Sequence, residues 1–293
     1  LGSVLNQTYH YWELLLVNNH STDNTLDIIS EIKDSRIKVF QINNDGVIAK
    51  SRNLGLEKAK WKYVAFLDSD DWWYPRKLEI CLKAMQENDV VYHPVHAYKE
   101  GRKLRKGLRV RRLTKPVFED LMLKANAIVN SGVMIRKEVL ERVGHVSESR
   151  KLVAVEDYDL WLRLSEISKL SCLKFFGVYL RDHKDRISSQ DKGIQQRIYA
   201  HCANISHIIR TNYGEKYDPI SNVSNNELPF FFDFVSKNLE ASNILFFYEK
   251  LYDFKYKLSG YSLFIKLISI PNYFNNLELM LKLIKWILYG DFI

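Results

Sequence analysis

Short apolar runs alternate with segments of helical spacing over the first 86 residues, and this alternation constrains the fold more than any other feature. Apolar or alternating runs predict strands at residues 12–17, 37–42 and 63–67. Helical spacing predicts helices at residues 25–32, 47–59 and 75–86, and the end of another helix at 3–9. Strands and helices that alternate at this pace are typical of repeated βαβ units. The chain is therefore predicted to adopt an α/β fold with a mostly parallel central sheet.

The pattern of apolar and charged residues changes near residue 190. Residues 263–270 and 277–289 carry apolar residues at helical spacing with lysines between them. We therefore expect one domain at residues 1–190 and an α-helical extension at residues 191–293. Helices of this composition can lie on a membrane surface. They can equally pack on the first domain or on a second subunit of a homo-oligomer. No apolar run reaches the ~18–20 residues that a membrane-spanning helix needs.

The net charge of +8 suits nucleic acid, an anionic membrane face or a diphosphate substrate, and it does not choose among them. Residues 99–115 hold nine Lys and Arg against a single Glu. Aromatic residues that would stack on bases are nearly absent there, so we expect no nucleic-acid partner. A solvated hairpin is the simplest interpretation of this segment. Contact with an anionic acceptor or a membrane is the alternative.

The three cysteines, Cys81, Cys172 and Cys202, are scattered and form no CxxC pair. This spacing favours neither a zinc site nor a disulfide framework, and it suits a reducing, cytoplasmic location. The chain opens with Leu1 rather than Met, so we expect that a preceding segment of the protein is missing.

Three carboxylates, those of Asp68, Asp70 and Asp71, follow the predicted strand 63–67 within four residues. Their charges repel one another, and burying them unpaired would cost several kcal/mol. Ligands of open α/β sheets bind beyond the carboxyl ends of the strands. A hard divalent cation, Mg²⁺ or Mn²⁺, could draw these carboxylates together and bridge them to a diphosphate. A solvated loop with an Asp that caps the next helix is the alternative.

A second acidic group, Glu156, Asp157 and Asp159, precedes apolar residues that share one helical face. Acidic residues are common at helix N-termini because the helix dipole favours them there. In a functional site, one of these carboxylates could act as a general base that removes the proton of an acceptor hydroxyl.

With the shorter motifs around them, the two acidic groups resemble the family 2 glycosyltransferases. The matching motifs, in the family's order, are NQTY at 6–9, WEL at 12–14, STDNT at 21–25, SRNLG at 51–55, DSDDWW at 68–73, P and KLE at 75–79, SGVMIR at 131–136, EDYDLWLRL at 156–164 and RDH at 181–183. They cover about the first 190 residues. The resemblance implies the GT-A fold. It also implies inverting transfer from a nucleotide-diphosphate sugar, expected to be a UDP-sugar, to a glycan or lipid-linked acceptor in surface polysaccharide synthesis.

The resemblance also implies roles for the acidic residues. Asp157 resembles the family's catalytic base, with Glu156 and Asp159 as neighbouring alternatives. Asp70 resembles the metal-binding Asp of the family's DxD motif, which implies a divalent cation as cofactor. His183 resembles the histidine that completes the metal or diphosphate site in several members.

The residues expected beside the donor are Asn18, Asn19, Asp23, Arg52, Asn53, Asp68 and Ser69. Asp71 is a further candidate at the acidic motif. Ser131 is expected on the acceptor side of the site, on the strength of the resemblance alone.

The sequence departs from the family's pattern at its start. The family usually has Asp at one or both positions held by Asn18 and Asn19, where a carboxylate accepts a hydrogen bond from the nucleotide base. An Asn can still accept one through its carbonyl, so base specificity is affected more than activity. His20 stands where the family commonly has Gly, and we interpret it as a loop residue. The family's first strand should precede Leu1, and it is expected to be missing from this chain.

Two alternatives stay open at this point. A nucleotidyltransferase can share a similar α/β architecture, although the EDYDLWLRL segment at 156–164 argues against it. A non-catalytic remnant, which folds partly and binds without turnover, is favoured by the missing strand and disfavoured by the intact acidic motifs.

Overall fold

The computed structural model of the chain describes residues 1–99, 126 and 128–182, with scattered positions between 196 and 220. The chain divides into two compact units, Leu1–Gln196 and Arg197–Ile293. The predicted helices at 263–270 and 277–289, and the basic segment after residue 99, lie outside the described residues. The helical extension at 191–293 therefore stays a prediction. Within the described part of the chain, no helix is long and apolar enough to cross a membrane.

The predicted elements of the first 86 residues are confirmed, with boundaries that differ by a few residues. The helices are α1 (Gly2–Leu5), α2 (Thr25–Glu31), α3 (Ile48–Lys58) and α4 (Lys77–Ala84). The strands are β1 (Leu14–Asn18), β2 (Ile37–Gln41) and β3 (Tyr63–Ala65). The α/β fold class is confirmed with them.

The rest of the unit adds short strands and two further helices. The strands are β4 (Trp72–Trp73), β5 (Val90–Tyr92), β6 (His96–Lys99), β7 (Val133–Arg136), β8 (Leu170–Cys172) and β9 (Val178–Asp182). The helices are α6 (Lys137–Val143) and α7 (Glu156–Ile167). Two 3-10 turns, Asn130–Gly132 and Arg150–Leu152, lie just before β7 and α7.

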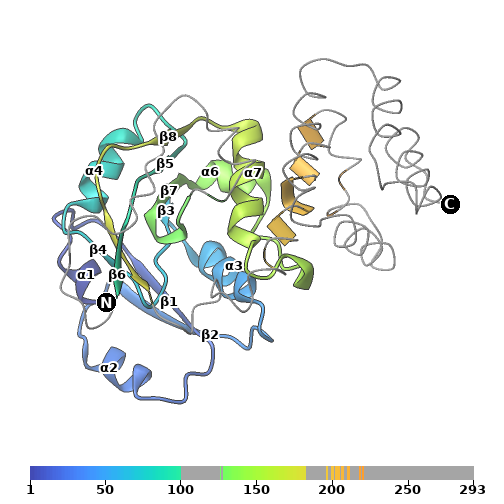
Figure 1. Cartoon of the computed structure of the whole chain (residues 1–293). Coiled ribbons are helices and arrows are strands. Elements are labelled where there is room, and N and C mark those ends of the chain that lie inside the picture. Colours follow the sequence, from blue (N-terminus) through green and yellow to red (C-terminus); the bar gives the residue numbers. More distant parts are fainter. Residues whose placement is uncertain are drawn as a thin grey trace, which may run out of the picture. The chain divides into compact units, whose positions relative to one another are not determined.

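The strands form three hydrogen-bonded sheets with mixed directions. β1 and β2 are parallel, with Leu16 opposite Val39. The four-stranded sheet has the order β3-β7-β5-β8, in which β7 is antiparallel to both of its neighbours. The third sheet has the order β4-β9-β6. In Figure 1, α4 lies on one side of the four-stranded sheet, and α6 and α7 lie on the other.

Among the described strands, three pairs are parallel and three are antiparallel, so strand directions are more mixed than the sequence predicted. The cause lies in the turn Asn130–Gly132, which meets the chain just beyond the end of β3. The backbone N–H of Asp68 donates to Ser131 Oγ at 3.0 Å. β7 therefore begins where β3 ends and must run back along it.

The core lies between the four-stranded sheet and the helices on its two sides. Val90, Val133 and Ile135 have no exposed surface, and neither does Trp161 of α7. Trp73 is 7% exposed, while Trp72, its neighbour on β4, stacks on Tyr179 with ring centroids 5.3 Å apart. Successive residues of a strand face opposite sides, so only Trp73 can enter this core.

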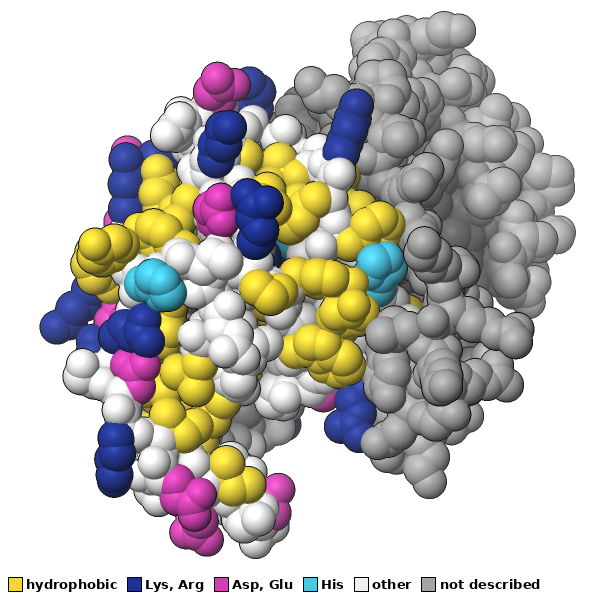
Figure 2. Space-filling model, turned by 90° about the vertical axis from the view of Figure 1, so that its left-hand side faces the viewer, with side chains coloured by type: hydrophobic (Ala, Val, Ile, Leu, Met, Phe, Trp, Pro, Cys, Tyr) yellow, Lys and Arg dark blue, Asp and Glu magenta, His cyan; other side chains and the backbone are white. Residues whose placement is uncertain are grey.

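Figure 2 shows the face that lies at the left of Figure 1. Hydrophobic side chains gather there in patches between scattered Lys, Arg, Asp and Glu, and the basic side chains form no continuous stripe. Scattered apolar side chains are common on protein surfaces.

Replacing Ile135 of β7 by alanine is predicted to lower the free energy of unfolding by about 2–5 kcal/mol, because a fully buried side chain leaves a cavity in the central strand. Ile28→Ala in α2 is the matched control, since Ile28 is 49% exposed. That variant should stay within about 0.5 kcal/mol of the parent. Urea unfolding measures both, and equal losses would contradict the placement of β7 at the centre of the core.

Candidate active site

The first acidic group forms a tight loop between β3 and β4. The backbone N–H of Asp71 donates to the carbonyl of Asp68 at 3.1 Å, which closes a turn over residues 68–71. We call these four residues the acid loop. Ser69 is exposed and Asp70 is partly exposed, whereas Asp71 is buried. Solvent exposure therefore decreases along the loop from Ser69 to Asp71.

Asp68 is held by neighbours from two other elements. Its Oδ1 accepts a hydrogen bond from Asn130 Nδ2 at 2.8 Å and a longer one from Arg52 at 3.4 Å. Asn130 opens the 3-10 turn before β7, and Arg52 lies on α3. Asn130 was not among the site residues predicted from the sequence. The signal that could have identified it is its position directly before the Ser131-Gly132 motif.

Both carboxylate oxygens of Asp71 accept hydrogen bonds. Ser131 Oγ donates to Oδ2 at 2.6 Å, and the backbone N–H of Arg181 on β9 donates to Oδ1 at 3.0 Å. The pKa of Asp71 is raised to about 6, mainly by burial and in part by the charges of Asp68 and Asp70, against the lowering effect of these hydrogen bonds. Asp71 thus ties the acid loop to β9.

Arg52 joins the acid loop to the second acidic group. One terminal nitrogen pairs with Glu156 Oε1 at 2.5 Å and the other contacts Asp68 Oδ1 at 3.4 Å. Burial lowers the pKa of the Arg52 guanidinium, but the charges of Asp68, Glu156 and Asp157 more than offset this and raise it. Two acidic motifs that lie about 90 residues apart in the sequence therefore meet at the guanidinium of Arg52.

Asp157 lies in the first turn of α7, where the helix dipole favours an acidic side chain. Its Oδ1 accepts from the backbone N–H of Tyr158 at 2.7 Å and its Oδ2 from Asn126 Nδ2 at 3.3 Å. The pKa of Asp157 is raised to about 7, mainly by burial and in part by the charge of Glu156, against the lowering effect of the Arg52 charge. A carboxylate with a pKa near neutrality is suited to general-base catalysis.

Two of the predicted site residues make structural contacts elsewhere. Asp159 is 2% exposed and pairs with Arg163 at 2.9 Å within α7. Asn53 is 5% exposed, and its amide holds both the N–H and the carbonyl of Val146. The structure therefore does not bring Asp159 or Asn53 into the group around Arg52.

The predicted donor-side residues at the end of β1 form a separate network. Asn18 donates to Gln41 Oε1 at 2.7 Å and accepts from Ser21, and Asn19 accepts from the backbone N–H of Asn44 at 2.9 Å. Asp23 is exposed, and hydrogen bonds from the side chain and the backbone N–H of Thr25 lower its pKa. His20 has φ of 51°, the left-handed region that favours glycine.

The carboxylates of Asp68 and Asp70 fit a hard divalent cation in chemical type. Both are partly exposed oxygen donors in one turn beyond a strand end. Across the described ranges, no three His, Cys, Asp or Glu side chains are grouped so that they could hold a metal ion. A cation held by one or two carboxylates and by substrate phosphates needs no such group. His183, the other predicted ligand, lies outside the described residues.

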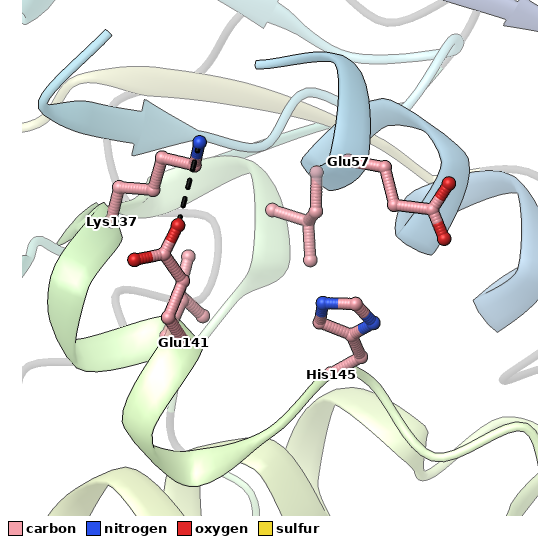
Figure 3. Close-up of a pocket in the computed structure, with 6 residues that line it drawn as sticks. Glu57, Lys137, Glu141 and His145 are labelled. Atoms are coloured by element: carbon pink, nitrogen blue, oxygen red, sulfur yellow. Dashed lines mark ion pairs between the residues drawn. The ribbon is translucent and has the colours of Figure 1, made fainter. Parts of the chain in front are cut away.

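A small pocket of about 120 Å³ lies between α3 and α6, away from the predicted site residues. Figure 3 shows Lys137 and Glu141 of α6 on one side of it and Glu57 and His145 on the other. Lys137 is paired with Glu141 at 3.4 Å and also donates to the carbonyl of Ala59 at 2.7 Å. None of the residues around Arg52 lines this pocket.

The fold is that of the GT-A glycosyltransferases. TarS 1–349 of S. aureus in complex with UDP-GlcNAc superposes with a TM-score of 0.59 at 19% identity, over 83% of this chain and 72% of that one. The complex of the same protein with UDP gives a TM-score of 0.56. At this identity the likeness shows the fold alone.

Comparison of sequences gives the family. Residues 1–144 match the family described as Glycosyl transferase family 2. The Escherichia coli protein WfaP, a UDP-Glc:alpha-D-GlcNAc-diphosphoundecaprenol beta-1,3-glucosyltransferase, is 35% identical over 190 residues, which are 64% of this chain and 72% of WfaP. The putative teichuronic acid biosynthesis glycosyltransferase TuaG of Bacillus subtilis is 42% identical over 92 residues, 31% of this chain and 36% of TuaG. The chain belongs to glycosyltransferase family 2, which excludes the nucleotidyltransferase alternative.

Replacing Arg52 by methionine is predicted to lower the free energy of unfolding by about 3–5 kcal/mol, because Glu156 is left as a buried charge without its partner. Adding Glu156→Gln to this variant should restore part of the loss. Arg76→Met is the control, since Arg76 and Glu79 form an exposed pair worth about 0–1 kcal/mol. Urea unfolding without ligand measures all three, and a double variant no more stable than Arg52→Met would contradict the pairing.

Proposed function

We propose that this chain is an inverting transferase that moves a sugar from a UDP-sugar to a glycan or lipid-linked acceptor during surface polysaccharide synthesis. The observation that carries the proposal is the meeting of the acid loop and the start of α7 at Arg52. The carboxylates that could hold a cation and the donor diphosphate thereby lie beside a candidate general base. The name of WfaP, which includes a UDP-sugar donor and a lipid-linked acceptor, supports the substrate classes.

We propose that Asp70, together with Asp68, holds a divalent cation, Mn²⁺ or Mg²⁺, with the donor diphosphate. When bound, such a cation stabilises the negative charge of the departing nucleoside diphosphate. Arg52 keeps Asp68 in place from one side and Asn130 from the other. On the donor side, Asn18, Asn19 and Asp23 are proposed to frame the nucleotide base, with Ser69 beside the diphosphate.

Asp157 is proposed to be the general base. It accepts the proton of the acceptor hydroxyl while the acceptor oxygen forms a bond to the anomeric carbon and the bond from that carbon to the diphosphate breaks. The displacement is in line, so the anomeric configuration inverts. Glu156 is engaged by Arg52, and Asp159 by Arg163, which leaves Asp157 as the carboxylate of this group that suits the role.

A lipid-linked acceptor would place the reaction at the cytoplasmic face of a membrane. We propose that the protein acts there as a peripheral protein, with its excess of basic residues favouring the anionic surface. Self-association through the C-terminal residues is a further proposal, based on their apolar periodicity. A non-catalytic remnant is the outcome that the experiments below would show if turnover were absent.

Donor binding is predicted to depend on a divalent cation and on Asp70. Calorimetry of UDP in MnCl₂ should show an affinity that is lost in EDTA and in Asp70→Ala. The reason is that the diphosphate charge is no longer neutralised beside the other carboxylates. Asp27→Ala, which removes an exposed carboxylate from α2, is the control and should bind like the parent. Equal affinity for UDP in MnCl₂ and in EDTA would overturn the metal site.

Replacing Asp157 by asparagine is predicted to slow transfer by about 10²–10⁴-fold with little change in UDP affinity, because a base acts in the transition state. The base must be ionised, so the rate of the parent enzyme should fall as the pH is lowered through the pKa of Asp157, about 7. Initial rates of transfer across this pH range measure both effects. If Asp157→Asn stays active while Glu156→Gln is inactive, the base is Glu156.

A further inference from the structure

We infer that the 3-10 turn Asn130–Gly132 is the element that fixes the shape of the acid loop, with Ser131 as its positioning residue. This inference rests on the proposed function, because it concerns how the same loop binds a cation and a diphosphate. It replaces the expectation that Ser131 contacts the acceptor.

The hydroxyl of Ser131 joins the two ends of the acid loop. It accepts the backbone N–H of Asp68 at 3.0 Å and donates its own proton to Asp71 Oδ2 at 2.6 Å. A hydroxyl is one of the few side-chain groups that can accept and donate at the same time. Ser131 has no exposed surface, so water cannot take over either hydrogen bond. Its neighbour Asn130 adds a third contact to the loop through Asp68 Oδ1.

Contacts with core residues hold the turn itself in place. The indole N–H of Trp73 donates to the carbonyl of Ser131 at 2.9 Å, and the ammonium of Lys77 lies 4.1 Å from the centre of the Trp73 ring. On the other side, a Cβ added at Gly132 would lie 3.3 Å from the carbonyl oxygen of His93, so the backbone is closely packed there. The turn therefore cannot move without disturbing the core.

Neutral donors suit this task because the acid loop has to keep its charge. Three carboxylates in four residues repel one another, and a loop free to relax would separate them. A cationic side chain at each carboxylate would cancel the charge that a divalent cation needs. Arg52 offsets part of the charge through its 3.4 Å contact with Asp68. The neutral hydroxyl of Ser131 and amide of Asn130 fix the geometry while the loop stays negative overall. Ser131 thus acts on the donor site through Asp68 and Asp71.

The test is calorimetry of UDP with the full chain, in MnCl₂ and in EDTA. Ser131→Ala is expected to weaken UDP binding in MnCl₂ by about 10- to 100-fold, the range for losing hydrogen bonds to a charged group. In EDTA, Ser131→Ala should leave any remaining affinity for UDP unchanged. Asp71→Ala should have the same effect. Because both variants break the contact between Ser131 and Asp71, the fold-loss of the double variant should be smaller than the product of the two single losses.

Two further variants keep the result clear. Ser165→Ala is the matched control, because Ser165 is a partly buried serine whose hydroxyl donates to the carbonyl of Leu162 within α7. It should bind UDP like the parent. If Ser131→Ala fails to melt cooperatively, Ser131→Cys replaces it, since a thiol fills the same space and donates only weakly. Its UDP affinity in MnCl₂ should also fall.

The outcomes separate the inference from the proposed function. Metal-dependent UDP binding by the parent that is lost in Asp70→Ala but kept in Ser131→Ala or Ser131→Cys would overturn the inference alone. Equal losses in MnCl₂ and in EDTA would also overturn it, because they would show a general collapse of the pocket. A parent protein with the same UDP affinity in both buffers would overturn the metal site and this inference with it.

Discussion

The pairing of the Arg52 guanidinium with the carboxylates of Glu156 and Asp68 is the interaction on which the rest of the site depends. It reaches Glu156 and Asp68 with different nitrogens, as its planar, forked shape allows. Without this cation, the carboxylates around it would repel one another in a partly buried place, where charges interact more strongly than in water. Arg52 of α3 therefore stabilises the approach of α7 to the end of β3.

The acidic residues of the site divide into two kinds by the partners they have. Glu156 and Asp159 each pair with an arginine and are almost fully buried, so their charges serve the structure. Asp157 and Asp68 accept hydrogen bonds from asparagines, which are neutral, and Asp68 has in addition only a longer contact of 3.4 Å with Arg52. A carboxylate held mainly by a neutral donor keeps its negative charge available. This difference fits the proposed roles of base and of donor-site carboxylate.

Residues that lie within one motif turned out to differ in what they contact. Arg52 and Asn53 are consecutive on α3, yet Arg52 faces the acidic groups while Asn53 binds the backbone of Val146. Successive residues of a helix point about 100° apart, so neighbours in sequence need not share a site. Val146 lies in the segment after α6, and the sequence around Asn53 does not predict the contact between the two residues.

The sequence by itself determined the alternating strands and helices of the first 86 residues, the two acidic groups and the family. Each of these depends on local spacing or on a motif that is contiguous in the chain. The tertiary structure decided the antiparallel direction of β7, the position of Ser131 between the two ends of the acid loop, and the different partners of Asp157 and Asp159. The two aspartates stand about 200° apart around α7, and both precede the same apolar face. Asp159 pairs with Arg163 one turn further along the same helix, whereas the contact of Arg52 with the start of α7 depends on packing between segments that are distant in the chain.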